Sequence, residues 1–261
     1  MYMVFIVGTA GSGKSYLTAA LSDWLEDNEL SVTRVNLDPA AEWIPYPPDV
    51  DVREYVDARK IMVERGLGPN GALLVSIDLL VSYIEELKSE ILDFKSNYVL
   101  IDTPGQLELY AFRQSGPLVG QLLAKGMKAV TLFLIDSFFA TEISNFISAL
   151  LLSASVNVRF KMPQLNVLSK SDLLPSKIID AIHEWLENPH SIPEVFEERA
   201  EPTLRLLSQR LIDVLTETQL ILEPIPVSSK TGEGLDTLYA NMQRLLAGGE
   251  DYLTEEPSGK L

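Results

Sequence analysis

The chain of 261 residues contains no cysteine and only two histidines, His183 and His190. The absence of cysteine excludes disulfides, thiolate metal sites and cysteine nucleophiles. Zinc sites are built largely from cysteine and histidine, so two isolated histidines also argue against a zinc enzyme. Thiol and zinc chemistry are therefore poor candidates for the function of this chain.

Basic residues are also scarce, because 21 lysines and arginines stand against 37 aspartates and glutamates and give a formal net charge of −16. An acidic protein repels nucleic-acid backbones and anionic lipid surfaces. We therefore expect no direct binding to nucleic acid. A few lysines, backbone N–H groups and a metal ion can still bind a triphosphate at short range, because distant charges are screened.

Long hydrophobic runs are missing, since no uninterrupted run approaches the roughly 20 residues that a helix needs to cross a bilayer. The longest candidate, 138–158, contains Glu142 and Asn145 and is interpreted as a buried or interface helix. The apolar start, 1–7, leads directly into a glycine loop and lacks the basic region and cleavage site of a signal peptide. We therefore predict a cytoplasmic protein with no membrane partner.

Short β-branched segments alternate with longer segments of helical periodicity. Several of the short segments are apolar almost throughout, which is typical of strands buried on both faces of a parallel sheet. This alternation predicts an α/β fold with a doubly wound, mainly parallel sheet flanked by helices. The predicted strands are 4–7, 32–37, 98–101, 129–135, 165–168 and 220–227, and the predicted helices are 14–28, 72–94, 140–158, 175–186, 203–217 and 235–246.

The candidate site residues described below are spread over nearly the whole chain, which favours a single domain covering 1–247 with a helical insertion at about 53–94. The stretch 39–52 contains four prolines and cannot form a regular helix, so we expect a surface connection there. The acidic segment 248–261 is predicted to be a disordered tail.

The first motif is at 8–15, where Gly-Thr-Ala-Gly-Ser-Gly-Lys-Ser matches the phosphate-binding pattern GxxxxGKS between a predicted strand and a predicted helix. Glycines allow backbone N–H groups to point at the phosphates, and the helix presents its positive end. Lys14 is expected to reach the β- and γ-phosphates and the Ser15 hydroxyl to bind Mg²⁺. A plain glycine turn is the alternative. The other nucleotide-contacting candidates here are Gly8, Gly11, Ser12, Gly13 and Tyr16.

The second motif, Asp-Thr-Pro-Gly-Gln at 102–106, follows the predicted strand 98–101. Ligands of such folds bind at the carboxyl edge of the sheet, where Asp102 would emerge. We expect Asp102 to hold Mg²⁺, the Gly105 N–H to contact the γ-phosphate and Gln106 to orient the attacking water. The alternatives are a strand-end cap for Asp102 and a solvent-facing turn for Gln106.

Asp38 ends the predicted strand 32–37 and is placed to project its carboxylate beside the phosphates. It is a second candidate for the Mg²⁺ shell and a candidate for orienting the attacking water. The structural alternative is a turn, because Asp-Pro commonly begins one.

The third motif, Ser-Lys-Ser-Asp at 169–172, resembles the guanine-reading pattern NKxD, with Ser169 in place of asparagine. The Asp172 carboxylate can accept both the N1–H and the exocyclic amine of guanine, which adenine does not offer. The aliphatic stem of Lys170 can cover the base plane. Without its position in the predicted sheet, this segment would be interpreted as a helix cap.

The fourth motif comprises Ser228, Ser229 and Lys230, and it follows the predicted strand 220–227. This segment resembles the SAK loop, in which a backbone N–H donates to guanine O6. A polar turn before the next helix is the alternative. The four motifs occur in the order that a guanine-nucleotide site requires, and together they predict Mg-GTP binding.

Two further segments are not explained by phosphate-loop chemistry: Asn-Leu-Asp-Pro-Ala at 36–40 and Gly-Leu-Gly-Pro-Asn-Gly at 66–71. The second predicts a turn in which Asn70 caps a helix from Ala72. Together with the four motifs and 51–56, the chain up to about residue 246 closely resembles the GPN-loop GTPases. That family lies within the class of P-loop NTPases that includes signal-recognition and MinD-type proteins.

The resemblance implies a homodimer in which Gly68, Pro69 and Asn70 of one subunit contact the γ-phosphate site of the other. Asn70 would then act in trans beside Asp38 and Gln106. The resemblance also implies GTP as substrate, GDP as product, Mg²⁺ as cofactor and an unidentified protein client, which for eukaryotic relatives is linked to RNA polymerase assembly. We therefore predict a GTP-hydrolysing switch that supports assembly of a protein complex.

Three other functions are compatible with the same phosphate loop. An ATPase of the MinD/ParA type usually has a lysine just after the first glycine, where this chain has Thr9. A small-molecule kinase would need an acceptor pocket and an arginine-rich lid. Arg53, Arg59 and Arg65 are available as an arginine finger for hydrolysis, but none is assigned that role. A non-hydrolysing GTP-bound assembly module would use the same residues for binding alone.

Overall fold

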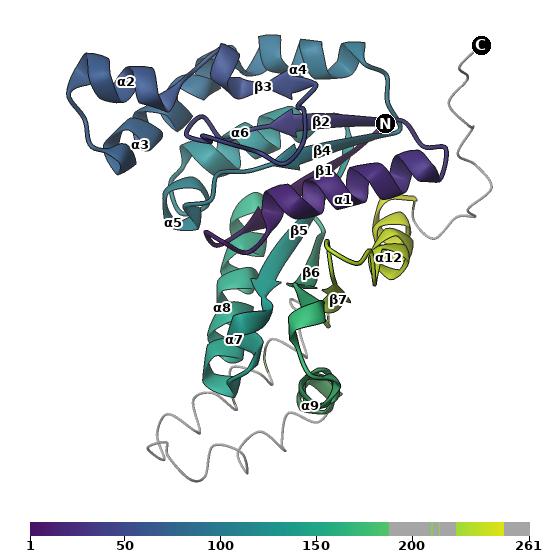
Figure 1. Cartoon of the computed structure of the whole chain (residues 1–261). Helices are drawn as coiled ribbons and strands as arrows, with labels where there is room; N and C mark the ends of the chain where they lie inside the picture. Colours follow the sequence, from purple (N-terminus) through teal and green to yellow (C-terminus); the bar gives the residue numbers. More distant parts are fainter. Residues whose placement is uncertain (188–209, 211–213, 215–222, 248–261) are drawn as a thin grey trace.

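The structure is a computed structural model that describes residues 1–187, 210, 214 and 223–247. Its centre is a parallel sheet of seven strands in the order β3-β2-β4-β1-β5-β6-β7 (Figure 1). β4, β2 and β3 lie on one side of the central β1 and β5, β6 and β7 on the other, which confirms the doubly wound fold class. The strands are β1 Tyr2–Gly8, β2 Val32–Asn36, β3 Val50–Asp51, β4 Tyr98–Asp102, β5 Lys128–Asp136, β6 Gln164–Ser169 and β7 Ile225–Val227.

Helices cover both faces of this sheet (Figure 1). Neighbouring residues of β1 point to opposite faces, so Phe5 and Ile6 belong to two different hydrophobic clusters. The cluster around Ile6 includes residues of α1 and α12, whereas the cluster around Phe5 includes residues of α3, α4, α6 and α8. The longer helices are α1 Lys14–Asp27, α2 Ala58–Arg65, α3 Pro69–Leu80, α4 Ile84–Asp93, α6 Ser115–Ala124, α8 Ile143–Phe160, α9 Ser176–Glu187 and α12 Leu235–Ala247, and the short ones are α5 Leu107–Tyr110 and α7 Ser137–Ala140.

One predicted helix is divided in the structure. The predicted helix 72–94 is α3, a 3-10 turn at Val81–Tyr83 and α4, whereas the predicted helix 140–158 corresponds to α8, which begins at Ile143 and ends at Phe160. The expectation that Asn70 caps a helix from Ala72 is wrong, because Gly68 occupies the N-cap and Pro69 the first helical position. Proline fits that position because the first N–H groups of a helix have no partner within it.

Helix α6 was not predicted, because glycine and proline residues such as Gly116, Pro117 and Gly120 are typical of loops. The structure explains Gly116, since a Cβ there would lie 1.9 Å from the Tyr110 carbonyl oxygen. A close backbone approach, and not a turn, requires this glycine.

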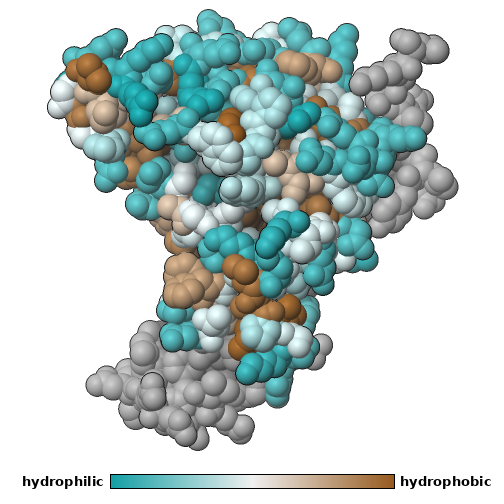
Figure 2. Space-filling model, viewed as in Figure 1, coloured by the Kyte–Doolittle hydropathy of each residue, from teal (hydrophilic) through white to brown (hydrophobic). Residues whose placement is uncertain are grey.

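The predicted helix 203–217, apart from Arg210 and Val214, and the predicted tail 248–261 lie outside the described residues. The strand predicted at 220–227 is β7 over Ile225–Val227, and residues 220–222 are also outside. Within the described part of the chain, no helix has the length and apolar character needed to span a membrane. The face in Figure 2 is mostly hydrophilic, with hydrophobic residues gathered in patches.

Candidate nucleotide-binding site

The loop 8–15 connects β1 to the N-terminal end of α1. Gly11 and Gly13 have φ of +78° and +91°, in the left-handed region that favours glycine. Gly8 allows close approach to β5, because a Cβ there would lie 2.9 Å from the Leu134 carbonyl oxygen. The Lys14 ammonium donates to the carbonyl oxygen of Gly8 at 3.1 Å and of Thr9 at 2.9 Å. The loop therefore curves around the Lys14 side chain at the N-terminal end of α1.

A cavity of about 410 Å³ lies at this loop, a volume within the usual range for small-molecule sites. We call it the phosphate cavity. Residues from four separate stretches of the chain line it, so the structure brings together the first three motifs and Asp38. The predicted site residues in its lining are Gly11, Gly13, Lys14, Ser15, Tyr16, Asp38, Asp102, Gly105 and Lys170.

Asp102 has the character of a metal ligand. Its side chain is buried, and its Oδ1 atom has no hydrogen-bond partner among the described residues. Burial raises the pKa of Asp102 to about 6, although the nearby Ser15 hydroxyl, the charge of Lys14 and the hydrogen bond from Tyr46 act in the opposite direction. A buried carboxylate oxygen beside a serine hydroxyl matches the hard-oxygen preference of Mg²⁺. The residues therefore fit this ion.

Asp38 lies in the loop after β2, where its carboxylate accepts the Ala40 N–H at 2.9 Å. Burial raises the pKa of Asp38, whereas hydrogen bonds from the Ala40 and Gly105 N–H groups and the charges of Lys14 and Arg53 lower it. Burial lowers the pKa of Lys14, and the charges of Asp102 and Asp38 oppose that shift. One lysine thus faces two carboxylates, which suits a site that takes up a metal ion and a polyanion together.

The segment 102–106 runs directly over the phosphate loop. A Cβ on Gly105 would lie 3.9 Å from the Lys14 Nζ atom and 3.8 Å from the Ala10 Cα atom. Gln106 then precedes α5, and its Oε1 atom is buried without a hydrogen-bond partner in the described structure. Gln106 as a whole is half-buried, and its role in orienting the attacking water stays a prediction.

The guanine-reading candidates contact the phosphate loop directly. Lys170 has φ of +58°, and its ammonium lies 2.7 Å from the Gly11 carbonyl oxygen and 2.7 Å from the Asp136 carboxylate. The Ser169 hydroxyl donates to the Ser12 carbonyl oxygen at 2.8 Å. This hydroxyl therefore links the two loops at the position where the NKxD pattern has asparagine.

The fourth motif is joined to the third through a side chain. The Ser228 hydroxyl donates to the Asp172 carboxylate at 2.8 Å, so the two base-reading loops are adjacent. Gly234 closes the loop after β7, since its φ is +81° and a Cβ there would lie 2.0 Å from the Pro226 carbonyl oxygen. Ser229 is half-buried and Lys230 is exposed in this loop.

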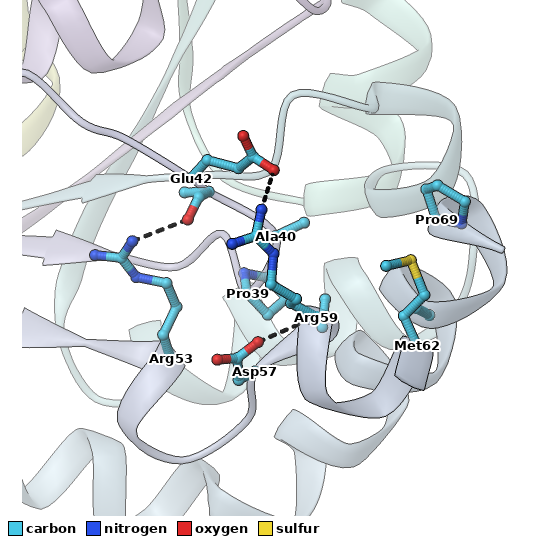
Figure 3. Close-up of a pocket in the computed structure, with 11 residues that line it drawn as sticks. Pro39, Ala40, Glu42, Arg53, Asp57, Arg59, Met62 and Pro69 are labelled. Atoms are coloured by element: carbon cyan, nitrogen blue, oxygen red, sulfur yellow. Dashed lines mark hydrogen bonds and ion pairs between the residues drawn. The ribbon is translucent and has the colours of Figure 1, made fainter. Parts of the chain in front are cut away.

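Gly68, Pro69 and Asn70 are exposed at the start of α3. They do not belong to the described lining of the phosphate cavity. Pro69 instead lines a second cavity of about 320 Å³, between α2, α3 and the loop after Asp38 (Figure 3). A contact of Asn70 with a nucleotide of another subunit stays a prediction.

Arg53, to which no role was assigned from the motifs, joins the Asp38 loop to the start of the insertion (Figure 3). Its guanidinium donates to both carboxylate oxygens of Asp51 and to the Ala41 carbonyl oxygen, the last at 2.9 Å. The Ala58 N–H donates to the Pro39 carbonyl oxygen at 2.9 Å, which fixes the same loop at a second point. The only sequence signal for Arg53 was its place in the segment DVREYV at 51–56, which is part of the family resemblance.

Tyr46 was also missed, because the proline-rich stretch around it was interpreted as a plain surface connection. Its side chain is buried, and its hydroxyl donates to Oδ2 of Asp102 at 3.1 Å. Burial and the neighbouring Asp102 carboxylate both raise the pKa of Tyr46, so its hydroxyl keeps its proton. An aromatic residue between Pro45 and Pro47 was the signal that could have found it.

The parallel sheet and the phosphate loop facing Asp102 define a P-loop nucleotide-binding protein. A protein-family model described as "Conserved hypothetical ATP binding protein" matches residues 6–248. GPN-loop GTPase 3 from Dictyostelium discoideum is 33% identical over 261 residues, which cover 98% of this chain and 90% of the relative. GPN-loop GTPase 3 from Danio rerio is 29% identical, covering 98% and 91%. A solved structure of a GTPase from Pyrococcus abyssi in its apo form has a TM-score of 0.83 and 30% identity, covering 94% and 97%. The chain belongs to the GPN-loop GTPase family, as its motifs predicted.

Proposed function

We propose that this chain binds Mg-GTP and hydrolyses the bond between the β- and γ-phosphates, as a cytoplasmic homodimeric switch. The observation that carries this proposal is the direct link between the base-reading and phosphate loops, made by Ser169 with Ser12 and Lys170 with Gly11. A single nucleotide can therefore contact both. The GTPases to which the chain is similar support the same activity.

Catalysis in such a site depends on positioning and charge neutralisation. The N–H groups of the phosphate loop and Lys14 would hold the β- and γ-phosphates. Ser15 and Asp102 would hold Mg²⁺, which supplies positive charge across the phosphates. Burial strengthens these interactions, because the charges act in a medium of lower effective dielectric than water.

Three side chains are proposed to place the attacking water. Asp38 lines the phosphate cavity, and Gln106 follows Gly105, which also lines it. Asn70 would come from the partner subunit, which suits its exposed position at the start of α3. These three residues would act on the water and on the γ-phosphate, and their loss should lower turnover more than nucleotide affinity.

The names of similar proteins disagree about the base of the nucleotide. The family model is described as ATP binding, whereas the relatives are named GTPases. Asp172 favours guanine, because an adenine in its place leaves the carboxylate without the two donors of guanine. A site built to pair with such donors can reject the wrong partner by about 10⁴-fold.

The two nucleotide states are proposed to present different surfaces to a protein client during assembly of a complex. Order changes and rigid-body shifts around a γ-phosphate are the usual means of such switching. The loop after Asp38 is a suitable transmitter, because Arg53 and Ala58 tie it to the helical insertion. A client related to RNA polymerase follows from the family resemblance alone.

Mixed dimers test hydrolysis and the trans role of Asn70 together. Lys14→Ala should abolish nucleotide binding, whereas Asn70→Ala should retain binding and lose turnover. After subunit exchange, half of the dimers contain one intact composite site, so about a quarter of the wild-type activity should return. Binding of GTP with no phosphate release by the wild type would instead indicate a non-hydrolysing module, and a phosphorylated acceptor would indicate a kinase.

A further inference from the structure

Asp102, which lines the phosphate cavity, is held from behind by a buried tyrosine. Tyr46 is 6% exposed, and its hydroxyl lies 3.1 Å from Oδ2 of Asp102. The other carboxylate oxygen, Oδ1, is buried and has no hydrogen-bond partner in the described structure. The Tyr46 hydroxyl therefore holds Oδ2 of Asp102, whereas Oδ1 is available to another ligand.

The local sequence holds the phenol in this place. Tyr46 lies between Pro45 and Pro47, and a residue before proline is restricted to extended backbone. The tyrosine side chain has only two major torsions and is packed in the protein interior. The hydroxyl is therefore presented to Asp102 at a low cost in conformational entropy.

We propose that Tyr46 is a positioning residue for the Mg²⁺ site, where its hydroxyl fixes Oδ2 of Asp102 and keeps Oδ1 oriented for the Mg²⁺ shell. The inference rests on the proposed function, since it needs Asp102 to serve Mg²⁺. Partners that orient a metal-binding side chain typically change metal affinity by 10- to 100-fold when they are removed.

The hydrogen bond between Tyr46 and Asp102 also connects Asp102 to one wall of the phosphate cavity. Trp43, Ile44 and Pro45 line that cavity and directly precede Tyr46. The Tyr46 hydroxyl is therefore also an anchor for this wall. A general loss of anchoring would weaken nucleotide binding with or without a metal ion, whereas positioning of Asp102 acts only when the metal is present.

Tyr46→Phe removes the hydroxyl and keeps the ring. Binding of a non-hydrolysable GTP analogue to the full chain is measured by calorimetry with saturating Mg²⁺ and with EDTA. We expect the enhancement by Mg²⁺ to fall about tenfold while the affinity in EDTA changes by less than about twofold. A Mn²⁺ titration followed by electron paramagnetic resonance, with the nucleotide bound, should show a similar loss of metal affinity.

Tyr110→Phe is the matched control, because the Tyr110 hydroxyl is also buried but has no hydrogen-bond partner among the described residues. It should leave both affinities unchanged. In an Asp102→Asn background, Tyr46→Phe should have no further effect on metal binding.

An unchanged Mg²⁺ enhancement in Tyr46→Phe would overturn the inference, and so would an equal loss of affinity with Mg²⁺ and with EDTA. Either result leaves the proposed function intact. A wild type whose nucleotide affinity does not depend on Mg²⁺ would refute the Mg²⁺ site itself, and the role of Tyr46 with it.

Discussion

The hydroxyl of Ser169 donates a 2.8 Å hydrogen bond to the carbonyl oxygen of Ser12. This contact spans 157 positions of the sequence and fixes the end of β6 against the phosphate loop. In the NKxD pattern an asparagine amide occupies this position and braces the loops. A shorter side chain makes a link to the same loop here, because β6 ends close enough for a hydroxyl to reach it.

We expect Ser169→Ala to lower GDP affinity by about 5- to 10-fold, since a buried carbonyl loses its donor and the two loops lose a link. Ser169→Asn should retain most of the affinity. Calorimetric titration with GDP measures both.

The control for this change is Ser148→Ala, because Ser148 is exposed and, among the described residues, its hydroxyl bonds only to the Ser144 carbonyl oxygen of its own helix. Ser148→Ala should bind GDP like the wild type. Equal affinities for Ser169→Ala and the wild type would show that the link does not contribute to the site.

Asp102→Asn should make the nucleotide-free protein more stable at pH 7. Burial raises the pKa of Asp102 to about 6, against 3.8 for a free carboxyl. The folded form therefore binds more protons than the unfolded form between these values, and wild-type stability falls as pH rises through that window. Two pKa units correspond to roughly 3 kcal/mol at most, and the loss of a charge beside Lys14 makes the gain smaller.

Urea unfolding at several pH values between about 4 and 7, in EDTA without nucleotide, measures this effect. The stability difference between Asp102→Asn and the wild type should shrink as the pH falls, because the wild-type carboxyl becomes protonated. A difference that is constant over the whole range would contradict burial as the cause of the shift.

Arg53→Gln should lower the free energy of unfolding by about 1–3 kcal/mol, because it removes the guanidinium hydrogen bonds to the Asp51 carboxylate and to the Ala41 carbonyl oxygen. Burial favours a raised pKa for Asp51, but hydrogen bonds from Arg53 and Asn36 outweigh it and hold the pKa below its usual value. Arg53→Lys should restore little, since an ammonium cannot reproduce the planar fork of the guanidinium.

Arg59→Gln is the matched control, because Arg59 and Arg53 both line the second cavity, between α2, α3 and the loop after Asp38. Its ion pair with Glu42 is short, at 2.6 Å, but the two side chains are 73% and 78% exposed. An exposed pair contributes little, so the expected change is below about 1 kcal/mol. Equal destabilisation by Arg53→Gln and Arg59→Gln, measured by urea unfolding, would contradict the role given to Arg53.

The sheet and the site motifs could be predicted because their signals are local. Apolar runs marked the buried strands, and the GxxxxGKS pattern marked the turn into α1. The contacts of Lys170 and Ser169 with the phosphate loop follow from strand order, because β1, β5 and β6 are neighbours and their carboxyl ends lie at one edge.

The missed features depend on contacts between distant segments. Gly116 resembles a helix breaker until the Tyr110 backbone is placed against it. Tyr46 resembles a loop residue until Asp102 is placed beneath its hydroxyl, and Arg53 is one of several arginines until Asp51 and Ala41 are placed around it. Local propensity and periodicity carry no information about such approaches.

In the proposed site, one guanine nucleotide bridges the Asp172 loop and the phosphate loop. Titration of the wild type and of Asp172→Ala with GTP and with ATP, both with Mg²⁺, tests it most directly. The wild type should prefer GTP strongly, and Asp172→Ala should lose that preference while it still binds the triphosphate. Equal affinity of the wild type for GTP and ATP would contradict the assignment of the base-reading loop.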